Sequence, residues 1–253
     1  MTVRVPPAAS RDELRGFVAR MLGWTNNRAV DLALRSIELA ANHRAALVLR
    51  GAEDLVPIAH SLHRRALGAN LPFIVCDPRR GDTPASVRLP ASYESGLRAV
   101  AAATGGTLCM RACRLPNDFS AATSRLQEID DVMLAVCVAS GDDDDAPLLV
   151  RPAPICVPPL ATRNDELSRI IDEYVQDAIA ELDASGTGFA DTDHAWVREH
   201  AAGSLAEIEK ATLRLVALRA SSNTTIAAAR LGMAQVSLVR WLGRRCPSAR
   251  VAP

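Results

Sequence analysis

The first 140 residues alternate between short apolar runs and amphipathic runs, and this alternation constrains the fold more than any other feature of the chain. Apolar runs with the length and composition of buried strands occupy residues 45–51, 71–77, 107–113 and 131–140. In the other segments apolar residues return every three or four positions, as in an amphipathic helix. These segments are residues 12–22, 27–43, 52–67, 94–104 and 117–129. The alternation predicts an α/β fold with a parallel sheet and flanking helices.

Size and charge narrow the class of protein. The chain has 253 residues, of which 49% are apolar, and its 29 Lys and Arg residues balance 29 Asp and Glu residues. A zero net charge excludes a uniformly basic wrapper of nucleic acid and an acidic disordered tail. No window approaches the roughly 20 uncharged apolar residues that a membrane-spanning helix requires, and residues 1–16 lack the apolar core of a signal peptide. We therefore expect no membrane association and a cytoplasmic location.

The character of the sequence changes near residue 161. Residues 163–184 form one long amphipathic pattern, and the segments after it also have helical periodicity. We expect three parts: an α/β domain over residues 1–161, a helical subdomain over residues 162–203, and an all-α domain over residues 204–253.

Residues 223–242 have the spacing of a helix-turn-helix. Ala227 and Ala228 are small enough to let two helices cross closely, and Gly232 supplies the left-handed residue of the turn. Apolar residues fall where a three-helix core would bury them: Leu231, Met233, Leu238 and Leu242, with Leu205, Ile208, Leu215 and Val216 on a supporting helix. The alternative is an ordinary helical hairpin with exposed arginines. The turn glycine, the paired alanines and the basic last helix together favour the helix-turn-helix.

In a helix-turn-helix the last helix, here about residues 234–244, lies in the major groove and reads bases with its N-terminal face. The residues expected to reach base edges are Gln235, Val236, Ser237 and Arg240. Gln can pair with adenine and Arg with guanine in a bidentate manner. The residues expected to contact phosphate, which sets register and affinity, are Thr224, Thr225, Arg230, Arg244 and Arg245.

The segment from Asn223 to Leu242 resembles the Fis-type helix-turn-helix that closes many bacterial enhancer-binding regulators, with the pattern N-x-T-x-A-A-x-x-L-G-I-x-R-x-T-L. Two positions depart from the pattern: Gln235 replaces the usual arginine, and Trp241 replaces the usual Lys or Arg. The resemblance implies a homodimer or higher homo-oligomer that binds double-stranded DNA at an inverted repeat. It also implies a bacterial, nucleoid-associated protein.

The first 200 residues resemble the AAA+ domain of the same sigma-54-dependent activators. The resemblance rests on landmarks in the family's order: AALVLRG followed by EDLVPIAHSLH, then PFIVCD, ATGGTLCM, RLQE and PICVPPLATRNDEL. It implies that the helical subdomain over residues 162–203 corresponds to the lid of those activators.

The parts that would bind and hydrolyse a nucleotide are missing from this sequence. A phosphate-binding loop needs G-K-[ST], whereas Gly51 is followed by Ala52-Glu53-Asp54, whose carboxylates repel phosphate. The strand that should end in Asp-Glu ends in Arg111-Ala112. No GAFTGA-like loop lies between Asp77 and Glu94. We therefore expect a degenerate domain without ATP hydrolysis, without sigma-54 remodelling and without a bound cofactor.

Two further losses agree with the missing nucleotide site. The acidic run Asp142–Asp145 stands where the family has an arginine-bearing segment, and Ala206 stands where the lid has its sensor arginine.

Other chemistry is weakly indicated. The Asp142–Asp145 run lacks the glycine and the spacing of a calcium loop, so a solvated loop is the better interpretation. His60 and His63 are three apart on a predicted helix, but no third ligand can be placed, and a helix-surface position is favoured over a metal site. The six cysteines lack paired C-x-x-C spacing and are expected to be reduced and mostly buried. We expect no metal site and no catalytic residues.

These observations predict a DNA-binding transcriptional regulator, not an enzyme, whose AAA+-like domain serves assembly or contact with a protein partner. Residues 210–253 contain eight Lys and Arg residues and no Asp or Glu, so the neutral total conceals a basic segment joined to an acidic body. Two alternatives stay open: an interaction antagonist or co-regulator of a true AAA+ activator, and an architectural DNA-binding protein without sequence selectivity.

Overall fold

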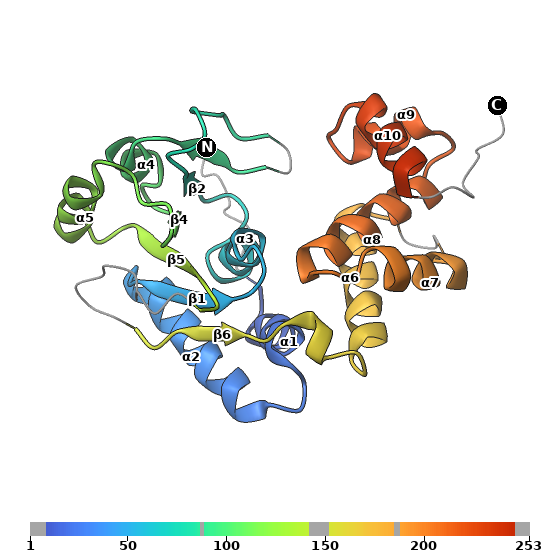
Figure 1. The fold of residues 1–253 in the computed structure, drawn as a ribbon, viewed down its shortest axis with the longest axis horizontal. Coiled ribbons are helices and arrows are strands. Elements are labelled where there is room, and N and C mark those ends of the chain that lie inside the picture. Colours follow the sequence, from blue (N-terminus) through green and yellow to red (C-terminus); the bar gives the residue numbers. More distant parts are fainter. Residues whose placement is uncertain (1–8, 87–88, 142–151, 185–187, 246–253) are drawn as a thin grey trace, which may run out of the picture. The chain divides into compact units, whose positions relative to one another are not determined.

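The computed structural model describes residues 9–86, 89–141, 152–184 and 188–245, and the chain divides into two compact units, residues 1–159 and 160–253 (Figure 1). The first unit is α/β and the described part of the second is helical. This arrangement confirms the expected fold: a parallel sheet with flanking helices, followed by a helical region. The division of the second unit into a lid-like part and a DNA-binding part stays a prediction.

The first unit contains the following elements in chain order: α1 (Arg11–Leu22), α2 (Asn27–His43), β1 (Leu47–Gly51), α3 (Val56–Ala66), β2 (Phe73–Cys76), β3 (Ala91–Tyr93), α4 (Gly96–Ala102), β4 (Thr107–Arg111), α5 (Phe119–Glu128), β5 (Met133–Ala139) and β6 (Ile155–Val157). The sheet has the order β3-β2-β4-β5-β1-β6, and all its neighbouring strands are parallel. Strand β3 was not among the strands expected from the sequence, because a strand of three residues has no recognisable period.

Each central strand sends alternate side chains to opposite faces of the sheet. One face packs against α4 and α5 through a cluster of buried residues that includes Val48, Ile74, Leu108 and Val136. On the other face, Thr107 of β4 contacts His63 of α3. Both faces of the sheet are therefore covered, which explains why its strands are continuously apolar.

A carboxylate from outside the helix begins α4. Asp118 accepts hydrogen bonds from the Ser95 hydroxyl at 2.7 Å and from the amides of Gly96 at 2.8 Å and Leu97 at 3.1 Å. These amides have no partner inside the helix. Although burial raises the pKa of Asp118, the hydrogen bonds outweigh it and the pKa lies below its ordinary value.

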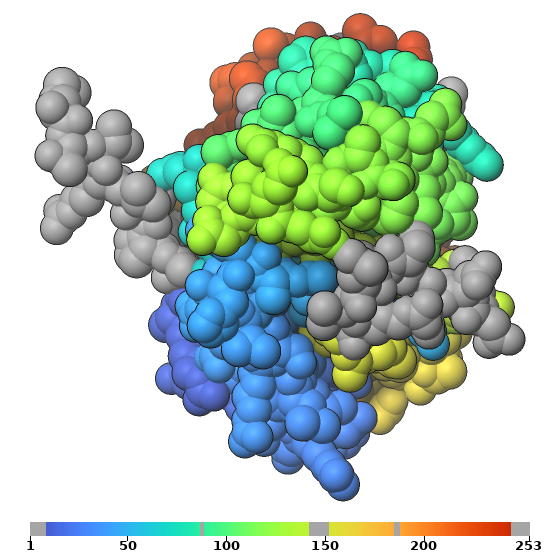
Figure 2. Space-filling model, turned by 90° about the vertical axis from the view of Figure 1, so that its left-hand side faces the viewer, coloured from blue at the N-terminus to red at the C-terminus, as the bar shows by residue number. Residues whose placement is uncertain are grey.

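Helix α2 lies on the surface of the first unit (Figure 2, blue), where Leu32 and Leu39 are more than half exposed. Arg28 and Arg35 of the same helix are also exposed.

The second unit contains a 3-10 turn (Leu160–Thr162) followed by α6 (Leu167–Glu181), α7 (Asp191–His200), α8 (Leu205–Arg219), α9 (Thr224–Arg230) and α10 (Gln235–Arg245). Helix α8 packs against α6, α7 and α9. Ser204 begins α8, its hydroxyl accepting a hydrogen bond from the Glu207 amide at 3.1 Å. Arg219 near the other end of α8 donates two hydrogen bonds to Asp193 of α7, at 2.9 and 3.0 Å. Helix α8 therefore joins α6 and α7 to the predicted helix-turn-helix.

None of the helices that the structure describes is both long enough and apolar enough to cross a membrane.

Candidate nucleic-acid interface

The turn between α9 and α10 has the geometry that its sequence predicts. Asn223 begins α9 by accepting a hydrogen bond from the Ile226 amide at 2.9 Å. After α9, Gly232 adopts φ +61°, and the Met233 amide donates to the Ala228 carbonyl at 3.0 Å. This is a helix end closed by a left-handed glycine, which sets the direction in which α10 starts.

The apolar side of the three helices is buried largely as expected. Leu205, Ile208, Leu215 and Val216 of α8 are all buried, as are Ala227, Ala228, Leu231, Leu238 and Leu242. Met233 is only partly buried. Its neighbour Gly232 turns the chain at this point, so Met233 lies at the edge of the core.

The outer side of α10 presents Gln235, Val236, Ser237, Val239 and Arg240, all of which are exposed. At about 100° per residue, Val236 and Arg240 lie opposite the buried Leu238, and Val239 lies between that outer side and the buried Leu242. Ser237 lies at the margin of this face. Val239 was missed by sequence reasoning, although its spacing of three from Val236 would have placed the two valines on the same side of the helix.

The remaining predicted DNA contacts are partly placed. Thr225 and Arg230 of α9 are exposed, and Thr224 is half-buried. The Gln235 side-chain amide donates to the Thr224 hydroxyl at 3.2 Å, so these two residues brace α10 against α9. The backbone of α10 continues through Arg244 and Arg245, whose side chains lie outside the described residues.

Trp241 does not occupy the surface position that the family pattern implies for a Lys or Arg. Its side chain is 9% exposed, and its ring meets the edge of Trp196 of α7 with 5.5 Å between centroids. The Arg214 guanidinium lies 5.0 Å from the same ring. Trp241 therefore fixes α10 to α7 and α8 and cannot replace a base-reading or phosphate-binding cation.

Some of the Lys and Arg residues in 210–253 make contacts within the second unit, and others are exposed. Arg219 is turned to Asp193, whose hydrogen bonds raise the pKa of the guanidinium. Arg214 lies over Trp241. Arg230 and Arg240 are exposed on the helix-turn-helix, so part of the positive charge stabilises the unit and part faces outward.

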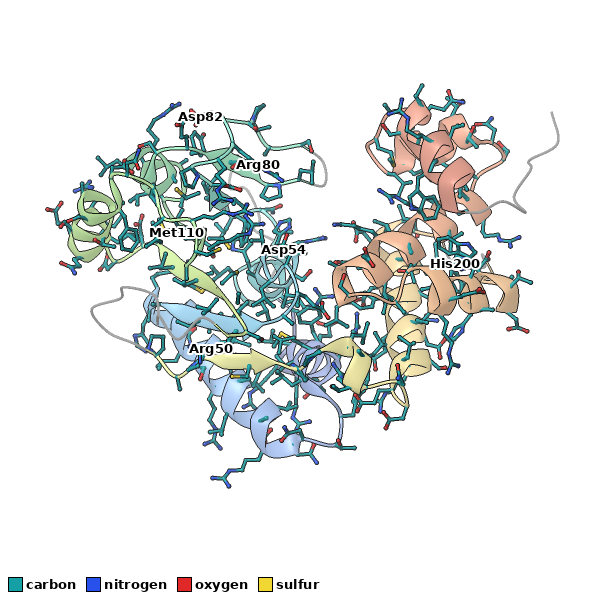
Figure 3. All side chains as sticks on the ribbon, in the orientation of Figure 1. Arg50, Asp54, Arg80, Asp82, Met110 and His200 are labelled. Carbon is teal, nitrogen blue, oxygen red and sulfur yellow. The ribbon has the colours of Figure 1, made fainter. Side chains whose placement is uncertain are left out.

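The carboxyl ends of the strands in the first unit carry a second group of charged residues. Arg111 at the end of β4 donates to both carboxylate oxygens of Asp54, at 3.0 and 3.1 Å. Its other terminal nitrogen lies 3.4 Å from Asp77, which follows β2 and whose side chain is 2% exposed. Arg114 and Arg80 approach the same Asp77 oxygen at 3.7 and 3.8 Å, and Figure 3 labels Asp54 and Arg80.

This network changes what the edge of the sheet can bind. Burial lowers the pKa of Arg111, but Asp54 and Asp77 outweigh it, and the shift is upward. The guanidinium is thus held in its charged form and is paired with the carboxylates of Asp54 and Asp77. The position expected to carry a magnesium-binding acid instead neutralises an acid in the loop after β1.

The two histidines of α3 are not on the helix surface as expected. His63 is 1% exposed, and its ring nitrogens lie 2.8 Å from the Thr107 hydroxyl and 3.0 Å from the Leu71 carbonyl. His60 is half-buried against Phe73, and burial lowers its pKa to about 4. His63 is therefore held as a structural polar group by contacts with β4 and with the loop after α3.

The other sequence expectations concern metals and thiols. Among the described residues, no three His, Cys, Asp or Glu side chains are grouped to hold a metal ion. The Asp142–Asp145 run and Cys246 lie outside the described residues. Cys76, Cys109 and Cys137 are buried and free, whereas Cys113 and Cys156 are exposed.

Neither any protein-family model nor any curated protein matches the chain. Among solved structures, the chain resembles NtrX from Brucella abortus in complex with ADP, with 14% identity and a TM-score of 0.46 over 85% of this chain and 68% of that chain. It also resembles NtrX in complex with ATP, with 15% identity and a TM-score of 0.45 over 86% and 68% of the two chains. The structural similarity to both chains is distant.

Proposed function

We propose that this protein is a DNA-binding transcriptional regulator in which α9, the turn at Gly232 and α10 contact duplex DNA. The observation that carries the proposal is the outer face of α10, which combines exposed Val236, Val239 and Arg240 above a buried seam of Leu238 and Leu242. Arginine and apolar side chains on one helix face suit the major groove, where acceptors and thymine methyl groups alternate.

The proposal assigns the α/β unit a non-catalytic, AAA+-like role in assembly or partner contact. It is supported by the Arg111–Asp54 pair, because a phosphate in the loop after β1 would compete with a carboxylate that already holds the nearest guanidinium. By the resemblance to Fis-type regulators, the protein acts as a homodimer or larger homo-oligomer on an inverted repeat.

A titration of duplex DNA with the full chain at several salt concentrations tests the DNA-binding role. The variant carries Arg240→Ala and Arg244→Ala together. Log affinity of the protein should fall linearly with log salt, with a slope of about 0.9 per neutralised phosphate. The double variant should bind more weakly, and each lost phosphate contact should make the slope shallower by that amount.

The matched control is Arg28→Ala with Arg35→Ala, which removes the same charge from an exposed face of α2. This control should leave affinity unchanged if the arginines of α10 contact DNA directly. Absence of binding at low salt, or equal weakening in both double variants, would overturn the proposed role.

Point substitutions are preferable to deleting residues 205–253. Helix α8 covers α6, and its buried residues include Ile208, Ala211 and Leu215. Deletion would expose the apolar side of α6 and destabilise the whole second unit, so lost binding would not identify the DNA contacts.

The non-catalytic role has a separate test. Equilibrium dialysis of the full chain against ATP and magnesium should detect no stoichiometric binding. Saturable binding that Arg111→Ala strengthens would show instead that the charged edge of the sheet still accepts phosphate.

A further inference from the structure

The second unit exposes an unusual share of large apolar side chains on its last two helices. Within the described residues, seven large hydrophobic side chains are exposed, and three of them belong to α9 and α10: Ile226, Val236 and Val239. Val236 is 65% exposed and Val239 is 48% exposed. Single exposed apolar residues are ordinary. Leu32 and Leu39 also share an exposed face of α2, so what distinguishes the two valines is their position directly after the turn at Gly232.

The two valines and Arg240 form one continuous strip. At about 100° per residue, the three side chains fall within about 100° of the helix circumference, with Val236 between the other two. The strip begins in the first turn of α10, directly after the turn at Gly232. This is the end of a recognition helix that approaches base edges.

The charge around the strip selects the partner. Arg240 belongs to the strip, Arg230 of α9 is also exposed, and no Asp or Glu occurs between residues 210 and 253. This combination suits a polyanion that also offers apolar groups to a helix. Duplex DNA meets both conditions, since the 5-methyl group of thymine is the apolar group displayed in the major groove.

We infer that Val236 and Val239 read thymine by packing against its 5-methyl group, so that each half-site contains thymine at the positions facing these side chains. The inference rests on the proposed DNA-binding function and specifies the DNA that the protein prefers. Gln235 is a weaker candidate for readout, because its amide is held by Thr224.

Deoxyuridine provides the test, because it differs from thymidine only in lacking the methyl group. A duplex is first selected from a random library with the full chain, and each thymine is then replaced singly by deoxyuridine. The wild-type protein should lose about fourfold in affinity for each contacted methyl group, as expected for one buried carbon. At the other thymines the replacement should have no effect.

The variants Val236→Ala and Val239→Ala connect the methyl groups to the side chains. Each variant should bind the thymine duplex more weakly and should no longer distinguish it from the deoxyuridine duplex at one position. Val236→Thr and Val239→Thr keep the side-chain shape and check that the loss does not come from misfolding. Leu39→Ala on α2 removes a comparably exposed apolar side chain and should keep full sensitivity.

The outcomes separate this inference from the function on which it rests. If no duplex binds in a salt-dependent manner, the proposed function itself fails. If DNA binds but no deoxyuridine replacement matters, if sensitivity survives in both alanine variants, or if selection returns no preferred sequence, thymine readout is overturned. Alanine variants that bind the thymine duplex as well as wild type would also overturn it.

Discussion

Removing Trp241 should destabilise the second unit strongly, because this side chain joins α10 to α7 and α8. A tryptophan buries about 150–250 Å², which at about 25 cal/mol per Å² corresponds to about 4–6 kcal/mol. Since part of that area remains covered in alanine, we expect Trp241→Ala to lower the free energy of unfolding by about 3–5 kcal/mol. The edge contact with Trp196 should supply about 0.5–1.5 kcal/mol of this loss.

Urea unfolding of the full chain, combined with amide hydrogen exchange resolved by segment, measures this effect. Exchange should accelerate in α7 through α10 and stay unchanged in β4 and β5 of the first unit. A double-mutant cycle with Trp196→Ala isolates the ring contact. Val236→Ala on the exposed side of the same helix is the control and should change stability by no more than about 0.5 kcal/mol.

The same experiment can refute the structural role of Trp241. If Trp241→Ala lowers the free energy of unfolding by less than about 1 kcal/mol, the ring is not packed as the structure has it. Truncating a buried tryptophan to alanine lowers this free energy by more than that. Trp241→Lys, which restores the residue type of the family pattern, should be at least as destabilising as the alanine variant. Tolerance of lysine would place position 241 on the surface.

Three further outcomes follow from described contacts. Burial lowers the pKa of His60 to about 4. In the unfolded chain His60 binds a proton near pH 6.5, whereas in the folded chain it stays neutral at that pH. The free energy of unfolding should therefore fall as pH decreases from about 7 to 4. His60→Gln should flatten that fall in urea titrations, and an unchanged slope would contradict it. Asp118→Ala removes the acceptor of the Ser95 hydroxyl and two amides and should cost about 1–2 kcal/mol at neutral pH by thermal unfolding. Because the pKa of Asp118 is lowered, the difference from wild type should become smaller in acid as the carboxyl is protonated, and a pH-independent difference would be inconsistent with this. Gly232→Val forces a branched side chain into a left-handed backbone and should lower the free energy of unfolding by about 1–2 kcal/mol. Amide hydrogen exchange in α9 and α10 should become faster. Unchanged exchange would argue against a left-handed turn at this position.

The sheet and its helices could be predicted because each central strand is a short, continuous apolar run between amphipathic segments. This pattern can be recognised locally, because a strand buried on both faces of the sheet is apolar at consecutive residues. Strand β3 (Ala91–Tyr93) escaped because it has three residues, too few to show a period. The left-handed turn at Gly232 was likewise predictable, since only its own neighbourhood decides its backbone angle.

The environments of single side chains were less predictable because they depend on residues far away in the sequence. From the sequence, Trp241 was interpreted as the replacement of an exposed Lys or Arg, whereas in the structure its ring packs against Trp196. His63 looked like a surface residue, yet its partner Thr107 lies on a strand 44 residues further along the chain. Arg111 and Asp54 were each recognised as departures from the family pattern, but the ion pair between them could not be read from either position alone.

The Arg111–Asp54 pair also limits how the sheet edge can change by mutation. Replacing Arg111 alone by an acidic residue would gather three carboxylates at the edge, around an Asp77 that is already buried. Replacing Asp54 alone would leave Arg111 without its bidentate partner. Each single substitution is unfavourable, so a change of charge at this edge that keeps its ion pairing requires at least two coordinated substitutions. Positions 54 and 111 are therefore expected to change together.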